Sequence, residues 1–170
     1  MLKHTCTHAH TSSSNSPTSL YCHLEFPGDA IVGFLIVKCF YNKYPCSSPA
    51  IISGLKNASI SNKTLGAICE IIGLQEHIVL ELTLSNNIET FVSQVKKRNG
   101  KKCYWDNLEV PEVMSNIIKS MLGAIFVDSR FETSVVQNVF DFWIKPVLEE
   151  HITFAVLNST SGDMNPVEIP

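Results

Sequence analysis

The sequence predicts an all-α protein, a single helical bundle. Residues 24–44 are apolar on nearly every side, as expected of a helix buried at the centre of a domain. Residues 83–98 place apolar side chains at intervals of three and four, the pattern of an amphipathic helix. No stretch shows the period-two alternation that predicts a strand, and no internal repeat is present. With 170 residues, 45% of them hydrophobic, the chain is long enough to bury one core.

The first half of the chain contains three predicted helices. Prolines in the turn at residues 45–49 end the helix over 24–44. A short helix follows at about residues 51–57. The next is predicted over residues 61–72, with its Ser-Asn start as the cap and Gly73 as the C-terminal stop.

The second half adds three more. The helix over residues 83–98 ends in a basic segment, and Pro111 suits the first turn of a helix that continues to about Phe126. The last helix is predicted over residues 132–150, with Pro146 interrupting its regular hydrogen bonds. Its expected inward-facing residues are Phe140, Trp143 and Val147.

Charge and cysteine usage narrow the functional classes. A net charge of -3 gives no general attraction to nucleic acid, so any RNA contact needs a local basic patch. The six cysteines are scattered without a CxxC pair, which favours reduced thiols. The N-terminus lacks an apolar signal-peptide core, and no apolar run is long enough to span a membrane. We therefore expect an intracellular protein, cytoplasmic or nuclear, that is neither secreted nor held in a membrane.

Two segments carry a family resemblance. Residues 24–30 read LEFPGDA and residues 110–124 read VPEVMSNIIKSMLGA. Together they resemble the two signature segments of the ribonuclease III family in its Dicer-like form. The similarity extends over residues 7–152, which we take as the domain, with residues 1–19 as a polar N-terminal segment continuous with it and residues 153–170 as a C-terminal tail.

The resemblance implies an all-helical ribonuclease III endonuclease-domain fold. It also implies a dimer in which each domain cuts one strand of double-stranded RNA, using four carboxylates that hold divalent ions. Glu25 and Asp29 occupy the first two carboxylate positions, whereas Asn116 and Lys119 stand where the family places an aspartate and a glutamate.

These two substitutions change the charge of the predicted metal site. Four negative charges become a net charge of minus one, and Mg²⁺ prefers anionic oxygen ligands to an amide or an ammonium. We therefore expect no cofactor, with Mg²⁺ or Mn²⁺ bound only if cleavage activity remains. Pro27, in place of the usual leucine, removes a backbone donor beside Glu25.

The roles of the four positions stay open at the level of sequence. Lys119 either pairs with Glu25 or Asp29, or contacts an RNA phosphate directly. Glu25 and Asp29 are either inherited acids near a helix start or ligands of a weak single-ion site.

Three further groups of residues are weaker candidates. The basic segment is equally consistent with RNA binding and with a solvated loop; it comprises Lys96, Lys97, Arg98, Lys101 and Lys102. Glu109 and Glu112 could form a metal-ligand pair shifted from the family's positions, but this is disfavoured because Pro111 lies between them. A zinc site is disfavoured because no second ligand cluster accompanies its four candidates, His4, Cys6, His8 and His10.

The leading hypothesis is a catalytically degenerate, Dicer-like ribonuclease III domain. It would act in RNA processing, such as RNA silencing, as a dimerisation or double-stranded-RNA-associated module, in a homodimer or with another ribonuclease III domain. One alternative is an active, divalent-metal-dependent endoribonuclease, and another is a structural protein of a ribosomal particle. The helix after Pro111 is apolar beyond one stripe, so five residues are candidates for the core or a partner-facing surface: Ile117, Ile118, Met121, Leu122 and Phe126.

Overall fold

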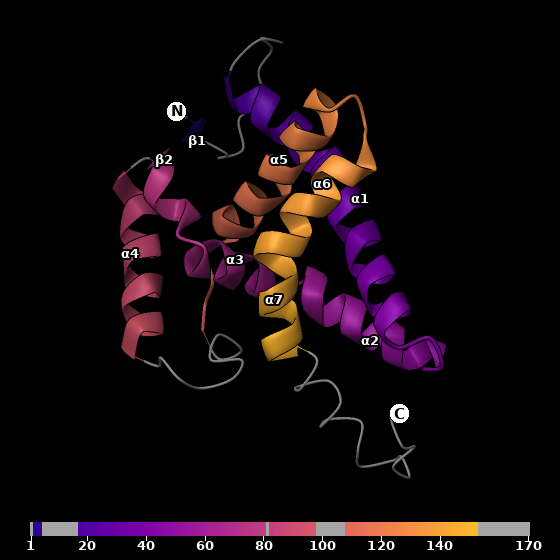
Figure 1. Cartoon of the computed structure of the whole chain (residues 1–170). Coiled ribbons are helices and arrows are strands. Elements are labelled where there is room, and N and C mark those ends of the chain that lie inside the picture. Colours follow the sequence, from indigo (N-terminus) through magenta and orange to yellow (C-terminus); the bar gives the residue numbers. More distant parts are fainter. Residues whose placement is uncertain (1, 5–16, 81, 98–107, 153–170) are drawn as a thin grey trace.

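The structure is a computed structural model that describes residues 2–4, 17–80, 82–97 and 108–152. Helices dominate this part of the chain, so the predicted all-α class is confirmed (Figure 1). Two long helices, α1 (Pro17–Lys43) and α5 (Glu112–Asp128), cross at its centre. None of the helices in these ranges is both long and apolar enough to cross a membrane.

The other elements surround this crossing. Between α1 and α5 lie α2 (Pro49–Ile60), α3 (Asn62–Ile71), the 3₁₀ turn η1 (Leu74–His77) and α4 (Leu82–Lys97). After α5 come α6 (Thr133–Val139), the π-helix η2 (Phe140–Ile144), α7 (Lys145–Val147) and the π-helix η3 (Leu148–Ile152). Figure 1 shows α4 at one edge, with α3 between it and the central pair.

The start of α1 differs from the prediction. The helix begins at Pro17 rather than near Leu24, so Glu25 and Asp29 lie well inside it. Proline suits a first helical turn because it has no N–H to satisfy there. Pro27 lies within the helix without ending it.

Local capping explains the predicted α2 and α3. The Ser48 hydroxyl accepts a hydrogen bond from the Ile51 N–H, and the Ser61 hydroxyl accepts one from the Thr64 N–H at 3.2 Å. Gly73 adopts a φ of 73°, the left-handed conformation that glycine enters without strain after a helix. The prediction of Ser61 or Asn62 as cap and Gly73 as stop is confirmed.

The last predicted helix is interrupted by π turns. Pro146 lies in α7, which is only three residues long and has a π-helix on each side, so the predicted irregularity is confirmed. Phe140 is fully buried as predicted, but the inward placement of Trp143 is wrong because 37% of that residue is exposed. A π turn takes more residues than an α turn, and the neighbouring Ile144 is buried instead.

One short ladder was not predicted. Strand β1 (Leu2–His4) pairs in parallel with β2 (Ile78–Leu80), with Leu2 opposite Ile78. Three residues are too few for an alternating pattern to be distinguishable in the sequence.

The core lies where α1, α3 and α5 meet. Its largest fully buried side chains include Phe40, Leu65 and Met114. Of the five apolar α5 residues, Ile117, Ile118 and Leu122 are buried, while Met121 and Phe126 pack partly buried against the core. Apolar burial therefore holds α5 against the bundle.

Two glycines allow the backbones of α1 and α5 to touch. A Cβ added at Gly28 would overlap the Lys119 carbonyl and lie 3.2 Å from the Gly123 nitrogen. A Cβ added at Gly123 would overlap the Leu24 carbonyl and lie 2.9 Å from the Gly28 nitrogen. Because the obstacles are backbone atoms, no side-chain rotation can relieve the overlap.

We predict that Gly28→Ala and Gly123→Ala each lower the free energy of unfolding by about 3 kcal/mol or more, because the helices must separate. Gly33→Ala is the matched control on α1, since its added Cβ would meet only the Ile60 Cδ1 at 3.6 Å. That change should be neutral or stabilise by up to about 1 kcal/mol, as expected for alanine in a helix. Urea unfolding measures all three; equal effects at positions 28 and 33 would contradict the close crossing.

Candidate functional site

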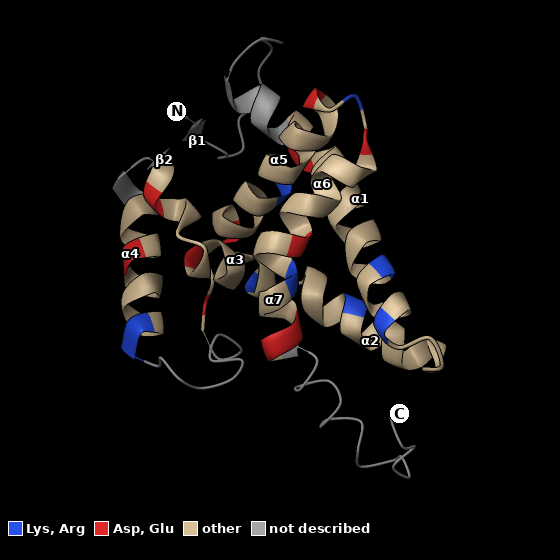
Figure 2. Cartoon of the chain, viewed as in Figure 1, with Lys and Arg blue, Asp and Glu red and all other residues tan. Residues whose placement is uncertain are grey.

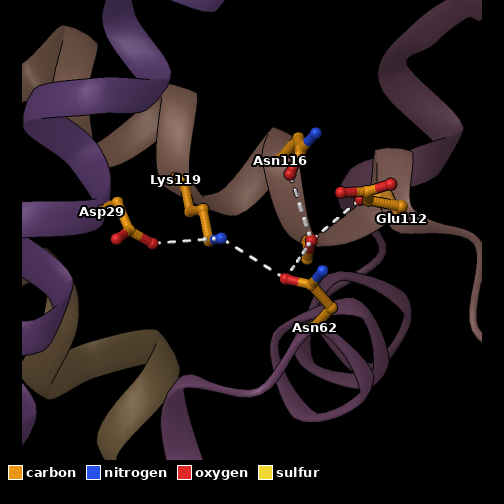
Figure 3. A network of polar contacts seen from close by, with 6 residues as sticks. Asp29, Asn62, Glu112, Asn116 and Lys119 are labelled. Atoms are coloured by element: carbon orange, nitrogen blue, oxygen red, sulfur yellow. Dashed lines mark hydrogen bonds and ion pairs between the residues drawn. The ribbon is translucent and has the colours of Figure 1, made fainter.

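The helix crossing brings Asp29 of α1 opposite Lys119 of α5. The Lys119 Nζ lies 3.0 Å from the Asp29 Oδ1, and Figure 3 shows the two side chains directed toward each other. The Lys119 side chain is 12% exposed and that of Asp29 is 51% exposed. Of the possible Lys119 partners considered from the sequence, the structure places Asp29 in contact.

Asn62, at the start of α3, also belongs to this site. Its Oδ1 accepts a hydrogen bond from the Lys119 Nζ at 3.4 Å and lies 3.1 Å from the Ser115 Oγ (Figure 3). From the sequence, Asn62 was a possible helix cap and a match to an asparagine of the family, and its contact with Lys119 was not predicted. One sequence feature could have indicated it. Ser61 supplies the cap of α3, so the neighbouring polar residue Asn62 is not needed for capping.

The Asn116 side chain is half-buried and contacts Ser115. Its Oδ1 lies 3.2 Å from the hydroxyl of Ser115, which also lies 2.8 Å from the Glu112 carbonyl oxygen. In Figure 3 Asn116 lies away from Asp29. The Asn116 amide is therefore a polar neighbour of Ser115.

Glu25 is half-buried one turn before Asp29. Burial raises the pKa of the Glu25 carboxyl group, and the negative charges of Glu112 and Asp29 raise it further, whereas the Lys119 ammonium lowers it. The charge of Glu112, considered from the sequence only as part of a disfavoured ligand pair, therefore acts on Glu25. Glu109, its proposed partner in a shifted ligand pair, is exposed on the preceding segment.

These contacts do not fit a two-metal centre. Asp29 already holds an ammonium at 3.0 Å, and the described residues contain no group of three His, Cys, Asp or Glu side chains arranged to hold a metal ion. A divalent ion in the same place would be repelled by Lys119 and would gain only a neutral amide from Asn62. The described side chains at this site therefore form a salt bridge in place of a set of anionic metal ligands.

The remaining candidates lie elsewhere or cannot be placed. Lys96 and Lys97 are exposed in the last turn of α4, at the lower end of that helix in Figure 2. The rest of the basic segment, Arg98, Lys101 and Lys102, lies outside the described residues. His4 lies in β1, while Cys6, His8 and His10 are outside the described ranges, so the zinc cluster has no structural account.

Free thiols are found at Cys39, Cys46 and Cys69. Burial raises the pKa of the Cys69 thiol to about 12. Cys69 is therefore a core residue with no thiolate at neutral pH and is unsuited to act as a nucleophile.

Comparison with known proteins identifies related sequences. The model of the ribonuclease III domain matches residues 23–130. The chain is 35% identical over 132 residues to Dicer-like protein 1 of Phaeosphaeria nodorum, which covers 74% of this chain and 9% of that protein. It is 34% identical over 119 residues to Endoribonuclease Dicer homolog 2 of Arabidopsis thaliana, covering 68% of this chain and 9% of that protein. The chain therefore spans a small part of these relatives.

The raised pKa of Glu25 predicts a pH-dependent effect on stability. The folded state holds the Glu25 proton above the ordinary value of 4.5, so ionisation costs stability as the pH rises from 4.5 through the folded pKa. Glu25→Gln removes that cost and should raise the free energy of unfolding at neutral pH, with the gain disappearing below pH 4.5.

Urea unfolding at several pH values measures this difference. Glu109→Gln is the matched control, and we expect little change because this side chain is exposed. A Glu25→Gln variant that is less stable than the wild type at neutral pH would show that the Glu25 charge stabilises the fold.

Proposed function

This chain belongs to the ribonuclease III family, and we propose that it is a catalytically degenerate member. Its role would be that of a dimerisation or double-stranded-RNA-associated module in RNA processing. The observation that carries the proposal is the ion pair between Lys119 and Asp29. A carboxylate that would bind metal in a catalytic member instead holds the chain's own ammonium.

The chemistry of hydrolysis supports this assignment. Metal-assisted cleavage of a phosphodiester needs an activated water and a stabilised leaving oxygen, both supplied by bound divalent ions. Lys119 offers no lone pair when charged and is an electrostatic barrier to such ions. Glu25 and Asp29 alone lack the further anionic ligands, because Asn116 is neutral and directed at Ser115.

The association with double-stranded RNA rests on the relatives. Two of them are named as Dicer endoribonucleases or Dicer-like proteins, and this chain corresponds to about a tenth of their length. We extend the RNA-processing context from those proteins to this chain, with an intracellular location. Lys96 and Lys97 at the end of α4 are available for phosphate contacts because both are exposed.

The dimerisation role is supported by the outer side of α1. Phe26 is 84% exposed, and the same side of the helix carries Phe34 and Tyr41, which are 51% and 64% exposed. Large apolar side chains in water favour a surface that is covered by a partner. A second copy or another ribonuclease III domain would bury this stripe.

The runner-up function is an active endoribonuclease. The retention of Glu25 and Asp29 within one helix favours it, because two acids one turn apart can share a cation. Such an enzyme would have to recruit the missing ligands from a partner.

Cleavage of double-stranded RNA by the purified chain distinguishes the two functions. In magnesium or manganese we expect no more product than in EDTA, because the ions are not held. Metal-dependent cleavage that Asp29→Asn abolishes would contradict the degenerate assignment and establish the active enzyme.

The gain-of-function control uses the two substituted positions. Asn116→Asp combined with Lys119→Glu restores the family's four acids, and isothermal titration should then detect manganese binding that the wild type lacks. If the double variant folds and binds no manganese, other residues such as Pro27 also disable the site.

Self-association tests the α1 surface. Phe26→Glu should weaken the dimer about tenfold or more, since losing a buried aromatic contact costs roughly 2 kcal/mol at an interface. Phe142→Glu is the matched control, because Phe142 is 76% exposed on η2, outside the proposed surface. Sedimentation equilibrium measures both. A dimer that is weakened by the control and not by Phe26→Glu would place the interface elsewhere.

A further inference from the structure

Three helices meet through the side chain of Lys119. Asp29 comes from α1, Asn62 from α3 and Lys119 from α5. The ammonium has three protons, and it reaches the Asp29 carboxylate at 3.0 Å and the Asn62 amide oxygen at 3.4 Å (Figure 3). Lys119 therefore contacts Asn62, which lies 57 residues earlier in the chain, and Asp29, which lies more than 80 residues earlier.

The ammonium is also well shielded from water. The Lys119 side chain is 12% exposed, compared with 37% for Lys43 and 39% for Lys145 in their ion pairs. An ammonium that loses this much hydration needs anionic or polar partners nearby, and a shielded pair is screened less by salt than a surface pair. The Lys119 side of this ion pair is thus more shielded than the lysines of the other two pairs, while the Asp29 side remains open to water.

Lys119 offsets repulsion between neighbouring acids. The charges of Glu112 and Asp29 both act unfavourably on the Glu25 carboxylate, and the Lys119 ammonium opposes them. Without the Lys119 charge, the repulsion of Glu25 by these two acids would be unopposed. In a catalytic member of the family, divalent ions supply that charge; here the residues do not fit such ions.

We infer that the Lys119 ammonium is a built-in structural cation, which joins α1, α3 and α5 and makes the stability of this fold independent of divalent metal. The inference rests on the proposed function, because it explains what replaces the lost metal site. A structural cation has a consequence for stability that loss of catalysis alone would not have. Removing the ammonium should create a demand for an external cation.

The test is thermal unfolding of the full chain in EDTA and in millimolar manganese chloride. The wild type should have the same Tm in both buffers. Lys119→Met keeps most of the aliphatic stem and removes the charge, so its Tm in EDTA should fall by about 2–4 °C. Manganese should then restore part of that loss by binding the uncompensated acids.

Lys43→Met is the matched control. It removes an ion pair of the same 3.0 Å length, to Glu149, at the other end of α1. Its Tm should not respond to manganese. Asn62→Ala, which removes the α3 contact to Lys119 together with the contact to Ser115, should lower the Tm without a manganese response. It keeps the test decisive if Lys119→Met does not fold.

Three results would overturn the inference. They are a Lys119→Met protein as stable as the wild type in EDTA, a wild type that manganese stabilises as much as that variant, and an Asn62→Ala protein with unchanged Tm. RNA cleavage is not part of these Tm measurements. If they overturn the structural role of Lys119, the proposed function is still tested separately by the cleavage assay.

Discussion

The contact between the α1 and α5 backbones at Gly28 and Gly123 determines the geometry of the whole site. Neither position has room for a Cβ, because backbone carbonyls of the opposite helix occupy the space. At such short separation, Cα–H groups face carbonyl oxygens, and side chains that flank the crossing are forced into contact. Asp29 follows Gly28 directly and Lys119 lies one turn before Gly123, so their pairing is a consequence of the crossing.

Positions 116 and 119 both lie on α5, on the other side of this crossing from Asp29. In this chain one of these positions supplies an ammonium and the other an amide that faces Ser115. The helix crossing therefore pairs an acid of α1 with an ammonium of α5, which lowers the negative charge at the site. The Lys119 charge does not fully compensate the acids at this site. Burial and the neighbouring acids raise the pKa of Glu25 despite the presence of Lys119.

Much of the fold was predictable because its signals are local. Ser61 and Gly73 act within one helical turn, and the apolar residues of α5 repeat with the helical period. The opposition of positions 29 and 119 followed from a family resemblance, which carries tertiary information that periodicity lacks. Local patterns could not reveal the Asn62 contact, which joins residues 57 apart, or the π turn that buries Ile144 and exposes Trp143.

The central claim is that the Lys119 ammonium occupies the place where a catalytic relative would bind its ions. Anomalous diffraction from crystals soaked in manganese tests this most directly. We expect no manganese peak between Asp29 and Lys119, and the 3.0 Å ion pair should remain intact. Two manganese ions coordinated by Glu25 and Asp29, with the ammonium displaced, would contradict it.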